Sequence, residues 1–192
     1  MFPELIRRMV EGLFAPRISA RGVLRAQYGL DTAIQFAVLA YCIQAIMAIL
    51  MPGVPGAQPQ GAGSSIGFHF LNIFAQLAII GMLAFAVWGI GQLFGGGGSR
   101  RQALVLVSWH ALVTTLLAPL FLLGASAVGQ EGDAIPLGVV LIFGVAVAQY
   151  LWVLACYTME LHGFRSPWGV MGVMLAVAVL LSTLVMSAAP GA

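Results

Sequence analysis

The sequence predicts an all-α polytopic membrane protein, a bundle of five transmembrane helices preceded by an N-terminal amphipathic helix. Its 192 residues are 61% hydrophobic and only 7% charged, and the mean hydropathy is +1.02. An ordinary soluble domain is about a quarter charged, so this chain lacks the polar surface that faces water. In addition, the apolar residues fall in five long runs, and the arginines lie before the first run and between alternate later runs.

Residues 1–30 are expected to form an amphipathic and juxtamembrane cytoplasmic segment. In residues 1–14, apolar side chains recur every three or four positions, and acidic and basic side chains occupy the other face. This spacing is typical of an amphipathic helix that lies in the membrane interface or docks on a bundle. Residues 15–30 are expected to keep their charges at the lipid headgroups, and their arginines are Arg17, Arg21 and Arg25.

The predicted transmembrane domain covers residues 31–190. Each of its five apolar runs has 20 or more residues, enough to cross a hydrocarbon core of about 30 Å at a rise of about 1.5 Å per residue. Ser99 and Gln102 have the spacing of a capping box at the start of the third run. We place the spans at about 32–51, 66–94, 101–128, 134–159 and 167–188.

The distribution of arginine predicts the orientation. Five of the eight arginines precede the first span, two lie in the loop at 95–101 and one in the loop at 160–166. The loops at 52–65 and 129–133 contain none. Because cytoplasmic loops are enriched in basic residues, five spans place the N-terminus in the cytoplasm and the C-terminus outside. We therefore expect an integral protein of the plasma (inner) membrane of a bacterium.

The composition argues against several other functions. The net charge of +2, from eight arginines against six acidic residues, is too small for a nucleic-acid-binding surface. Cys42 and Cys156 lie within apolar runs, as packing cysteines do, so neither a disulfide nor a metal site is expected. No HExxH motif is present. We predict no catalytic residues, no metal, no cofactor and no enzymatic activity.

The loop at 95–101 is the most distinctive stretch. Its four glycines allow close backbone approach, and a capped helix start with two arginines follows them. Such a loop could bind a lipid phosphate or an acidic partner, together with the arginines of the N-terminal segment. The plainer interpretation is a turn whose arginines follow from the membrane orientation alone. The residues concerned are Gly95, Gly96, Gly97, Gly98, Ser99, Arg100 and Arg101.

Polar side chains within the predicted spans form a second set of candidates. An ionisable residue inside a membrane is a functional candidate by default, although histidine and glutamine also serve as hydrogen-bonding residues between helices. We favour that structural role for the histidine of the third span. Glu160 is expected to pair with Arg165 in a cytoplasmic turn that also contains His162. The intramembrane candidates are His110, Gln76, Gln149 and Glu160.

Three stretches resemble the Yip family of Ypt/Rab-interacting membrane proteins, in particular its short bacterial members with a Yip-one-type domain. They are LFAPRISARGVL, the run from Gly95 through RQAL to the proline at position 119, and LHGFRSPWGV. The resemblance implies five spans and a cytoplasmic N-terminus. Eukaryotic relatives act in vesicle trafficking through prenylated small GTPases, but the segment here lacks their long polar N-terminal domain. The family has no assigned catalytic residues.

These observations favour a non-enzymatic membrane protein of the Yip type that organises or binds membrane lipid and partner proteins. Its expected partners are membrane lipid, anionic lipid included, and a membrane protein or a second copy of the chain. The first alternative is a small permease or channel subunit in which His110 and amide side chains line a path. The second is an enzyme acting on lipid, with Glu160 and His162 as acid and base.

Overall fold

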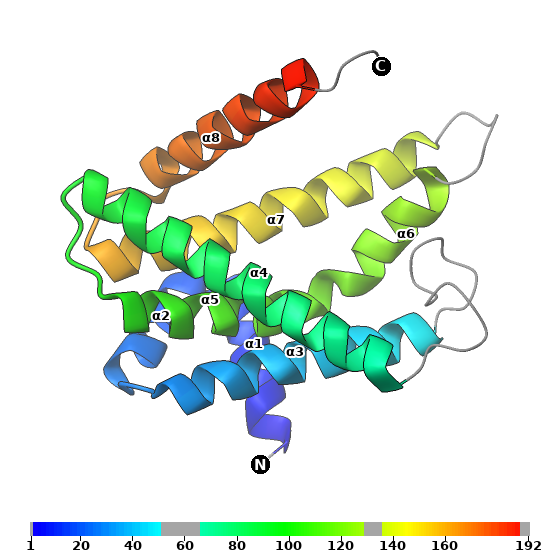
Figure 1. Cartoon of the computed structure of the whole chain (residues 1–192), viewed down its shortest axis with the longest axis horizontal. Coiled ribbons are helices and arrows are strands. Elements are labelled where there is room, and N and C mark those ends of the chain that lie inside the picture. Colours follow the sequence, from blue (N-terminus) through cyan, green and yellow to red (C-terminus); the bar gives the residue numbers. More distant parts are fainter. Residues whose placement is uncertain (1, 51–65, 129–135, 189–192) are drawn as a thin grey trace.

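The computed structural model describes residues 2–50, 66–128 and 136–188, and this part of the chain is built of helices joined by turns. Figure 1 shows the long helices extending across the molecule, with α4 and α8 diverging from each other. The loops expected at 52–65 and 129–133 lie outside the described residues. The elements are α1 (Phe2–Phe14), α2 (Pro16–Arg25), α3 (Leu30–Leu50), α4 (Ile66–Leu93), α5 (Arg100–Thr114), η1 (Thr115–Leu117), α6 (Ala118–Val128), α7 (Leu137–His162) and α8 (Pro167–Ala188).

Among the described residues, four helices are long and apolar enough to cross a membrane. They lie in α3, in α4, in α5 continued through η1 and α6, and in α7. α8 is apolar as well, but its apolar range among the described residues, Pro167–Val177, is shorter than those of the other four helices. All five predicted runs correspond to helical segments whose ends fall within three residues of the expected positions. The all-helical membrane fold is therefore present, and the fifth span remains a prediction.

The third run is divided by a 3₁₀ turn, η1, between α5 and α6. Pro119 explains this break, because a proline has no N–H to donate and its ring collides with the carbonyl four residues earlier. The hydroxyls of Thr114 and Thr115 donate to the carbonyls of His110 and Leu112, at 2.8 and 2.7 Å. These bonds keep the polar groups around the break satisfied inside an apolar bundle.

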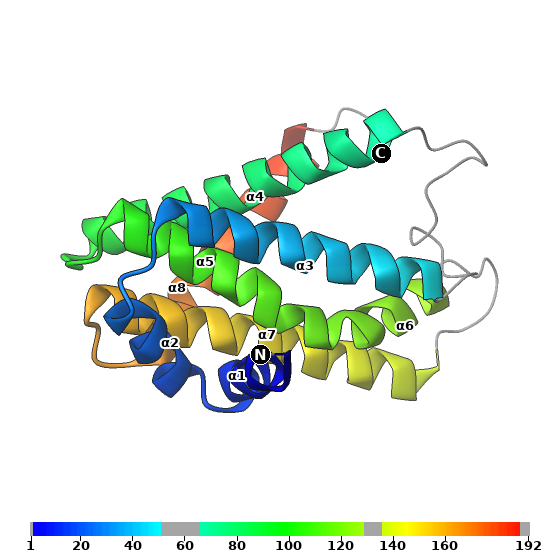
Figure 2. The ribbon, with the colours of Figure 1, turned by 90° about the horizontal axis from the view of Figure 1, so that it is seen from below.

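The N-terminal segment forms two helices that lie on the bundle. α2 begins at Pro16, and the missing N–H of a proline costs nothing at a first helical position. α2 packs against α7, while α1 contacts α2, α5 and α7. Figure 1 shows α1 running across the long helices, and Figure 2 shows it end-on beside them. The stretch 15–30, expected as a juxtamembrane segment, is thus helical over most of its length.

Buried side chains gather in one half of the bundle. In α7, residues 153–159 are buried, whereas residues 140–145 of the other half are exposed. The apolar window that begins at Arg100 is 61% buried, against 17% for the windows in α3 and α4. α5 is therefore the central helix, and it packs against α3, α4 and α7. The well-packed half contains the α4–α5 loop and the α7–α8 turn.

Candidate functional site

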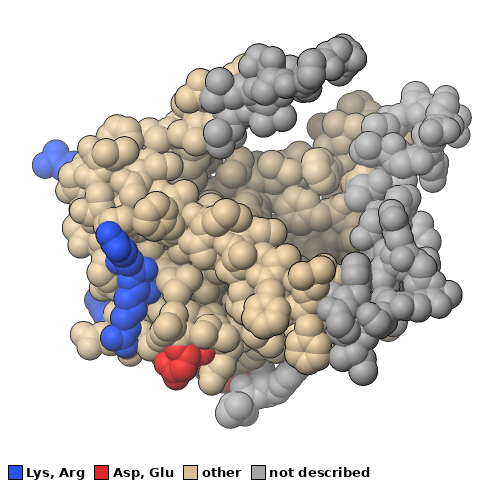
Figure 3. Space-filling view, in the orientation of Figure 1, with Lys and Arg blue, Asp and Glu red and all other residues tan. Residues whose placement is uncertain are grey.

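The well-packed half ends in a surface that we call the arginine-bearing end, formed by the last turn of α2, the start of α5 and the α7–α8 turn. Its exposed arginines are Arg25, Arg100, Arg101 and Arg165. On the face shown in Figure 3, the basic side chains lie at one end of the molecule, opposite the residues that are not described. The helix packing thus brings together arginines from three separate stretches of the sequence.

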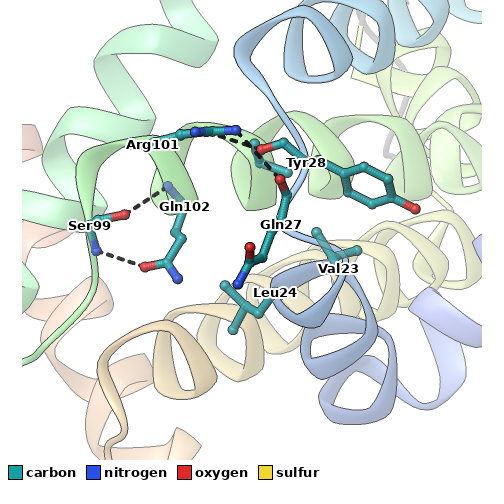
Figure 4. Close-up of a pocket in the computed structure, with 8 residues that line it drawn as sticks. Val23, Leu24, Gln27, Tyr28, Ser99, Arg101 and Gln102 are labelled. Atoms are coloured by element: carbon teal, nitrogen blue, oxygen red, sulfur yellow. Dashed lines mark hydrogen bonds between the residues drawn. The ribbon is translucent and has the colours of Figure 1, made fainter.

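A hollow of about 350 Å³ opens at this end, between α2 and the first turn of α5. Figure 4 shows its side chains, with apolar residues of α2 on one wall and polar residues of α5 on the other. A site of this size holds a small polar group rather than a macromolecule. The lining residues are Val23, Leu24, Gln27, Tyr28, Ser99, Arg101, Gln102 and Val105.

Arg101 joins the walls of this hollow. Its Nε donates to the carbonyl of Tyr28 at 3.2 Å, and its Nη2 donates to the carbonyl of Gln27 at 3.5 Å. Gln27 has a positive φ of 49°, a conformation that non-glycine residues adopt rarely. Because Arg101 holds the α2–α3 turn against α5, it has a structural role here in addition to its charge.

The start of α5 has the capping box that the sequence predicted. Gln102 N–H donates to Ser99 Oγ at 3.2 Å, and Ser99 N–H donates to Gln102 Oε1 at 3.1 Å. The guanidinium carbon of Arg100 lies 4.2 Å from the centre of the Trp88 ring, within reach of a cation–π interaction. The capping box is confirmed, and Arg100 remains a surface cation.

The glycine-rich loop packs closely against the last turn of α7. Gly95 has a φ of +77°, and Gly96 N–H donates to the carbonyl of Gly91 at 2.9 Å, as in the Schellman motif that ends a helix. A Cβ on Gly98 would lie only 2.6 Å from Leu161 Cγ. The turn and the close approach together account for glycine at three of these positions without any ligand.

His162 was expected in a cytoplasmic turn, and this expectation is wrong, because His162 is the last residue of α7 and its side chain is buried. The ring lies against Gly91 and Gly96, where a Cβ on either glycine would overlap it. Its Nε2 is 3.2 Å from the carbonyl oxygen of Val87. His162 therefore attaches the end of α7 to the end of α4.

The expected pairing of Glu160 with Arg165 is also wrong. Arg17 Nε donates to Glu160 Oε1 at 3.1 Å, and Arg21 Nε donates to Oε2 at 2.8 Å, so the carboxylate binds α2. The hydrogen bond with Glu160 raises the pKa of Arg21. Because the chain reverses at the α7–α8 turn, Arg165 lies on the α4–α8 side instead. Residues two apart on a helix do not share a face, so Glu160 and His162 form no acid–base pair.

A polar cluster that the sequence analysis did not identify fixes α2 to the bundle. Trp109 Nε1 donates to Ser19 Oγ at 2.9 Å, and the hydroxyl of Tyr157 lies 3.3 Å from the same oxygen. A Cβ on Gly12 of α1 would lie 3.0 Å from that hydroxyl. The only signal in the sequence was the serine on the apolar side of a short helix, which by itself does not reveal a partner.

The intramembrane candidates occupy separate places. His110 is buried, with Nε2 at 3.2 Å from the carbonyl oxygen of Tyr150 and its ring edge-on to the Tyr150 ring. Gln149 Nε2 donates to the carbonyl of Leu13 at 2.6 Å, which satisfies one of the free carbonyls at the end of α1. Gln76 is half-buried on α4. The structure does not bring these residues together into one site.

α1 presents both charge and apolar surface outward. Hydrogen bonds from Arg7 and Arg8 lower the pKa of Glu4 to about 2, so its carboxylate offsets one of the two guanidinium charges. On another side of the two N-terminal helices, a stripe of apolar residues is exposed. The stripe consists of Ile6, Val10, Phe14 and Ile18.

Within the described residues, no three His, Cys, Asp or Glu side chains are grouped so that they could hold a metal ion. The chain matched no protein-family model, no curated protein and no solved structure. The fold and the arrangement of its charges therefore define a class, a helical membrane protein with exposed arginines of α2, α5 and the α7–α8 turn at one end. The resemblance to the Yip family stays a prediction.

Proposed function

We propose that this chain is a non-enzymatic integral membrane protein of the Yip type that binds anionic lipid at its arginine-bearing end. In this proposal it has five spans and lies in the bacterial plasma (inner) membrane, with that end in the cytoplasm. The Yip assignment is supported by the three sequence stretches named above. The function would be to organise lipid, and proteins bound to it, at the cytoplasmic leaflet.

The charge of the arginine-bearing end carries the proposal. Arg25, Arg100, Arg101 and Arg165 lie there, Arg17 and Arg21 lie further back along α2, and the acidic residues described near these arginines are Glu160 and Asp31. Glu160 neutralises part of the charge of α2, whereas Arg25 and Arg165 form no ion pair with any described residue. Each arginine near an anionic leaflet contributes about 1 kcal/mol of attraction, which salt weakens.

The exposed apolar stripe on α1 and α2 supports the same proposal. Helices that lie on a membrane surface combine basic side chains with apolar side chains that enter the headgroup region. Here Phe14 is 79% exposed and Ile18 is 62% exposed, next to arginines of α2. Both N-terminal helices would therefore contact lipid while polar contacts hold them on the bundle.

The test compares lipid preference in the full-length protein. The protein is titrated in detergent with phosphatidylglycerol and with phosphatidylcholine, and bound lipids are counted by native mass spectrometry. Replacing Arg25 and Arg100 together by Gln should weaken phosphatidylglycerol binding by about tenfold or more, because each lost charge removes about 1 kcal/mol. Phosphatidylcholine binding should stay unchanged.

The matched control replaces the same two arginines by Lys, which keeps the charge. This variant should retain the preference for phosphatidylglycerol, since the attraction depends on charge and distance rather than on the guanidinium shape. We leave Arg101 unchanged because it also holds the α2–α3 turn. If the Gln variant prefers phosphatidylglycerol as strongly as the natural chain does, the proposed function is wrong.

A further inference from the structure

A second hollow, separate from the one in Figure 4, lies between α4, α7 and α8. It has a volume of about 640 Å³, within the range of about 300–1,000 Å³ that is usual for sites of small ligands. α8 packs chiefly on α7, and Figure 1 shows it standing apart from α4 along its length. Gly169 and Ala86 on its walls are exposed, so the hollow is a groove that opens at the molecular surface.

The wall of this groove is apolar along its length and polar at one end. Aliphatic and aromatic side chains line it, from Leu83 on α4 to Phe94 directly after that helix, and from Gly169 to Val177 on α8. The hydroxyl of Thr158 donates to the carbonyl of Leu154 on its own helix, and the side chain is buried. At the arginine-bearing end, the lining changes to Arg165 and Ser166.

The length of the groove distinguishes a lipid acyl chain from a membrane-spanning helix as its occupant. Leu83 and Phe94 are eleven residues apart, about 16 Å along a helix, and the stretch on α8 is about 12 Å. Half the hydrocarbon core of a bilayer is about 15 Å thick. The groove therefore covers one leaflet, starting at the headgroup level. A spanning helix from a second copy would need a groove about twice as long.

We propose that this groove binds one acyl chain of a phospholipid from the cytoplasmic leaflet, with the phosphate of its headgroup at Arg165 and Ser166. This is a defined lipid site on the α4–α8 side. It rests on the proposed function in one respect, namely that the arginine-bearing end faces the cytoplasm. A guanidinium without an ion pair among the described residues, beside a hydroxyl, suits a phosphate. The apolar walls suit the chain.

The decisive variant fills the groove with protein. Gly169 lines the groove and a Cβ there would meet no atom within 4 Å, so Gly169→Leu adds its side chain at an open position of the groove wall. Gly172 lies on the same helix, has the same open surroundings and does not line the groove, so Gly172→Leu is the matched control. Both variants are made in the full-length chain, and helix content measured by circular dichroism verifies that each folds.

Binding is measured by native mass spectrometry during titration with phosphatidylglycerol that has palmitoyl and oleoyl chains. Gly169→Leu should weaken the tightest lipid site about tenfold, whereas Gly172→Leu should leave it within about twofold of the natural chain. Arg165→Gln should weaken the same site and Arg165→Lys should preserve it. Equal binding by the two leucine variants would overturn the proposal.

A photoreactive phosphatidylglycerol with a diazirine on its acyl chain identifies the place of binding. Labelled peptides should come from residues 83–94 and 169–177, and Gly169→Leu should abolish this labelling. Even labelling of all apolar helices would overturn the proposal, and so would disulfide-linked dimers formed through Val173→Cys. The variant in which Arg25 and Arg100 are replaced by Gln should keep the labelling. Failure of the proposed function, tested by that variant's lipid preference, is therefore distinguishable from failure of the groove proposal, tested by the labelling.

Discussion

Replacing Gly91 by Ala should destabilise the bundle, because the new methyl group would overlap the buried ring of His162. Forcing an extra carbon into a packed site costs about 1–3 kcal/mol. Displacing His162 also breaks its bond to Val87, worth about 1 kcal/mol. Alanine is better than glycine in a helix by about 1 kcal/mol, which offsets part of the loss. The expected net destabilisation is about 1–3 kcal/mol.

Gly89 provides the matched control on the same helix. A Cβ there meets no atom within 4 Å, so Gly89→Ala should be neutral or should stabilise α4 by up to about 1 kcal/mol. Unfolding of the purified protein by increasing sodium dodecyl sulfate in mixed micelles, followed by circular dichroism, measures both. If Gly91→Ala is as stable as Gly89→Ala, His162 does not occupy the position described.

A double-mutant cycle separates this contact from a general effect on α4. In His162→Ala the ring is gone, so adding Gly91→Ala should cost little or should be favourable. The interaction energy between the two substitutions should reach about 1–3 kcal/mol, as for residues in direct contact. If the effects of the two substitutions are additive, the destabilisation by Gly91→Ala does not come from the contact with His162.

Three further predictions concern the N-terminal helices. Ser19→Ala removes the partner of Trp109 and Tyr157, and the loss of about 1–3 kcal/mol should speed hydrogen exchange in α1 and α2 but not in α4. Glu160→Gln frees two arginines of α2, so phosphatidylglycerol should bind up to about tenfold tighter, while Glu11→Gln should change little. The ion pairs of Glu4 stabilise α1 only while its carboxyl is ionised. Because its pKa is lowered to about 2 from 4.5, their contribution is fully present above pH 4.5 and declines as the pH falls towards 2. Hydrogen exchange in α1 corrected for its intrinsic pH dependence should follow this course, and in Glu4→Gln that corrected rate should not vary with pH.

The helices could be predicted from the sequence because their signals are local. Hydrocarbon thickness fixes the length of an apolar run, and the Ser99 and Gln102 spacing marks a helix start within three residues. The 3₁₀ turn before Pro119 also has a local cause, because the proline itself interrupts the helical hydrogen bonds. Each of these features depends on residues within one or two turns of one another.

The contacts of the candidate site could not be predicted in this way. Glu160 lies 139 positions from Arg21, and nothing in the sequence near Glu160 distinguishes that partner from the nearby Arg165. The glycine-rich loop shows the same limit. Its composition fits an anion-binding turn and a close helix contact equally well, and only the position of α7 reveals that Gly96 and Gly98 lie against another helix.

The uneven packing connects the two proposals. At the arginine-bearing end, α1 and α2 cover α5 and α7 with protein, and His162 and Glu160 attach neighbouring helices there. In the other half, residues 140–145 of α7 are exposed, and in a membrane lipid would cover them. The groove beside α8 lies in the packed half but lacks a protein cover, so its apolar walls are where a bound lipid would complete the packing. A lipid held there should stabilise the protein against dodecyl sulfate, and Gly169→Leu should remove that dependence on added lipid.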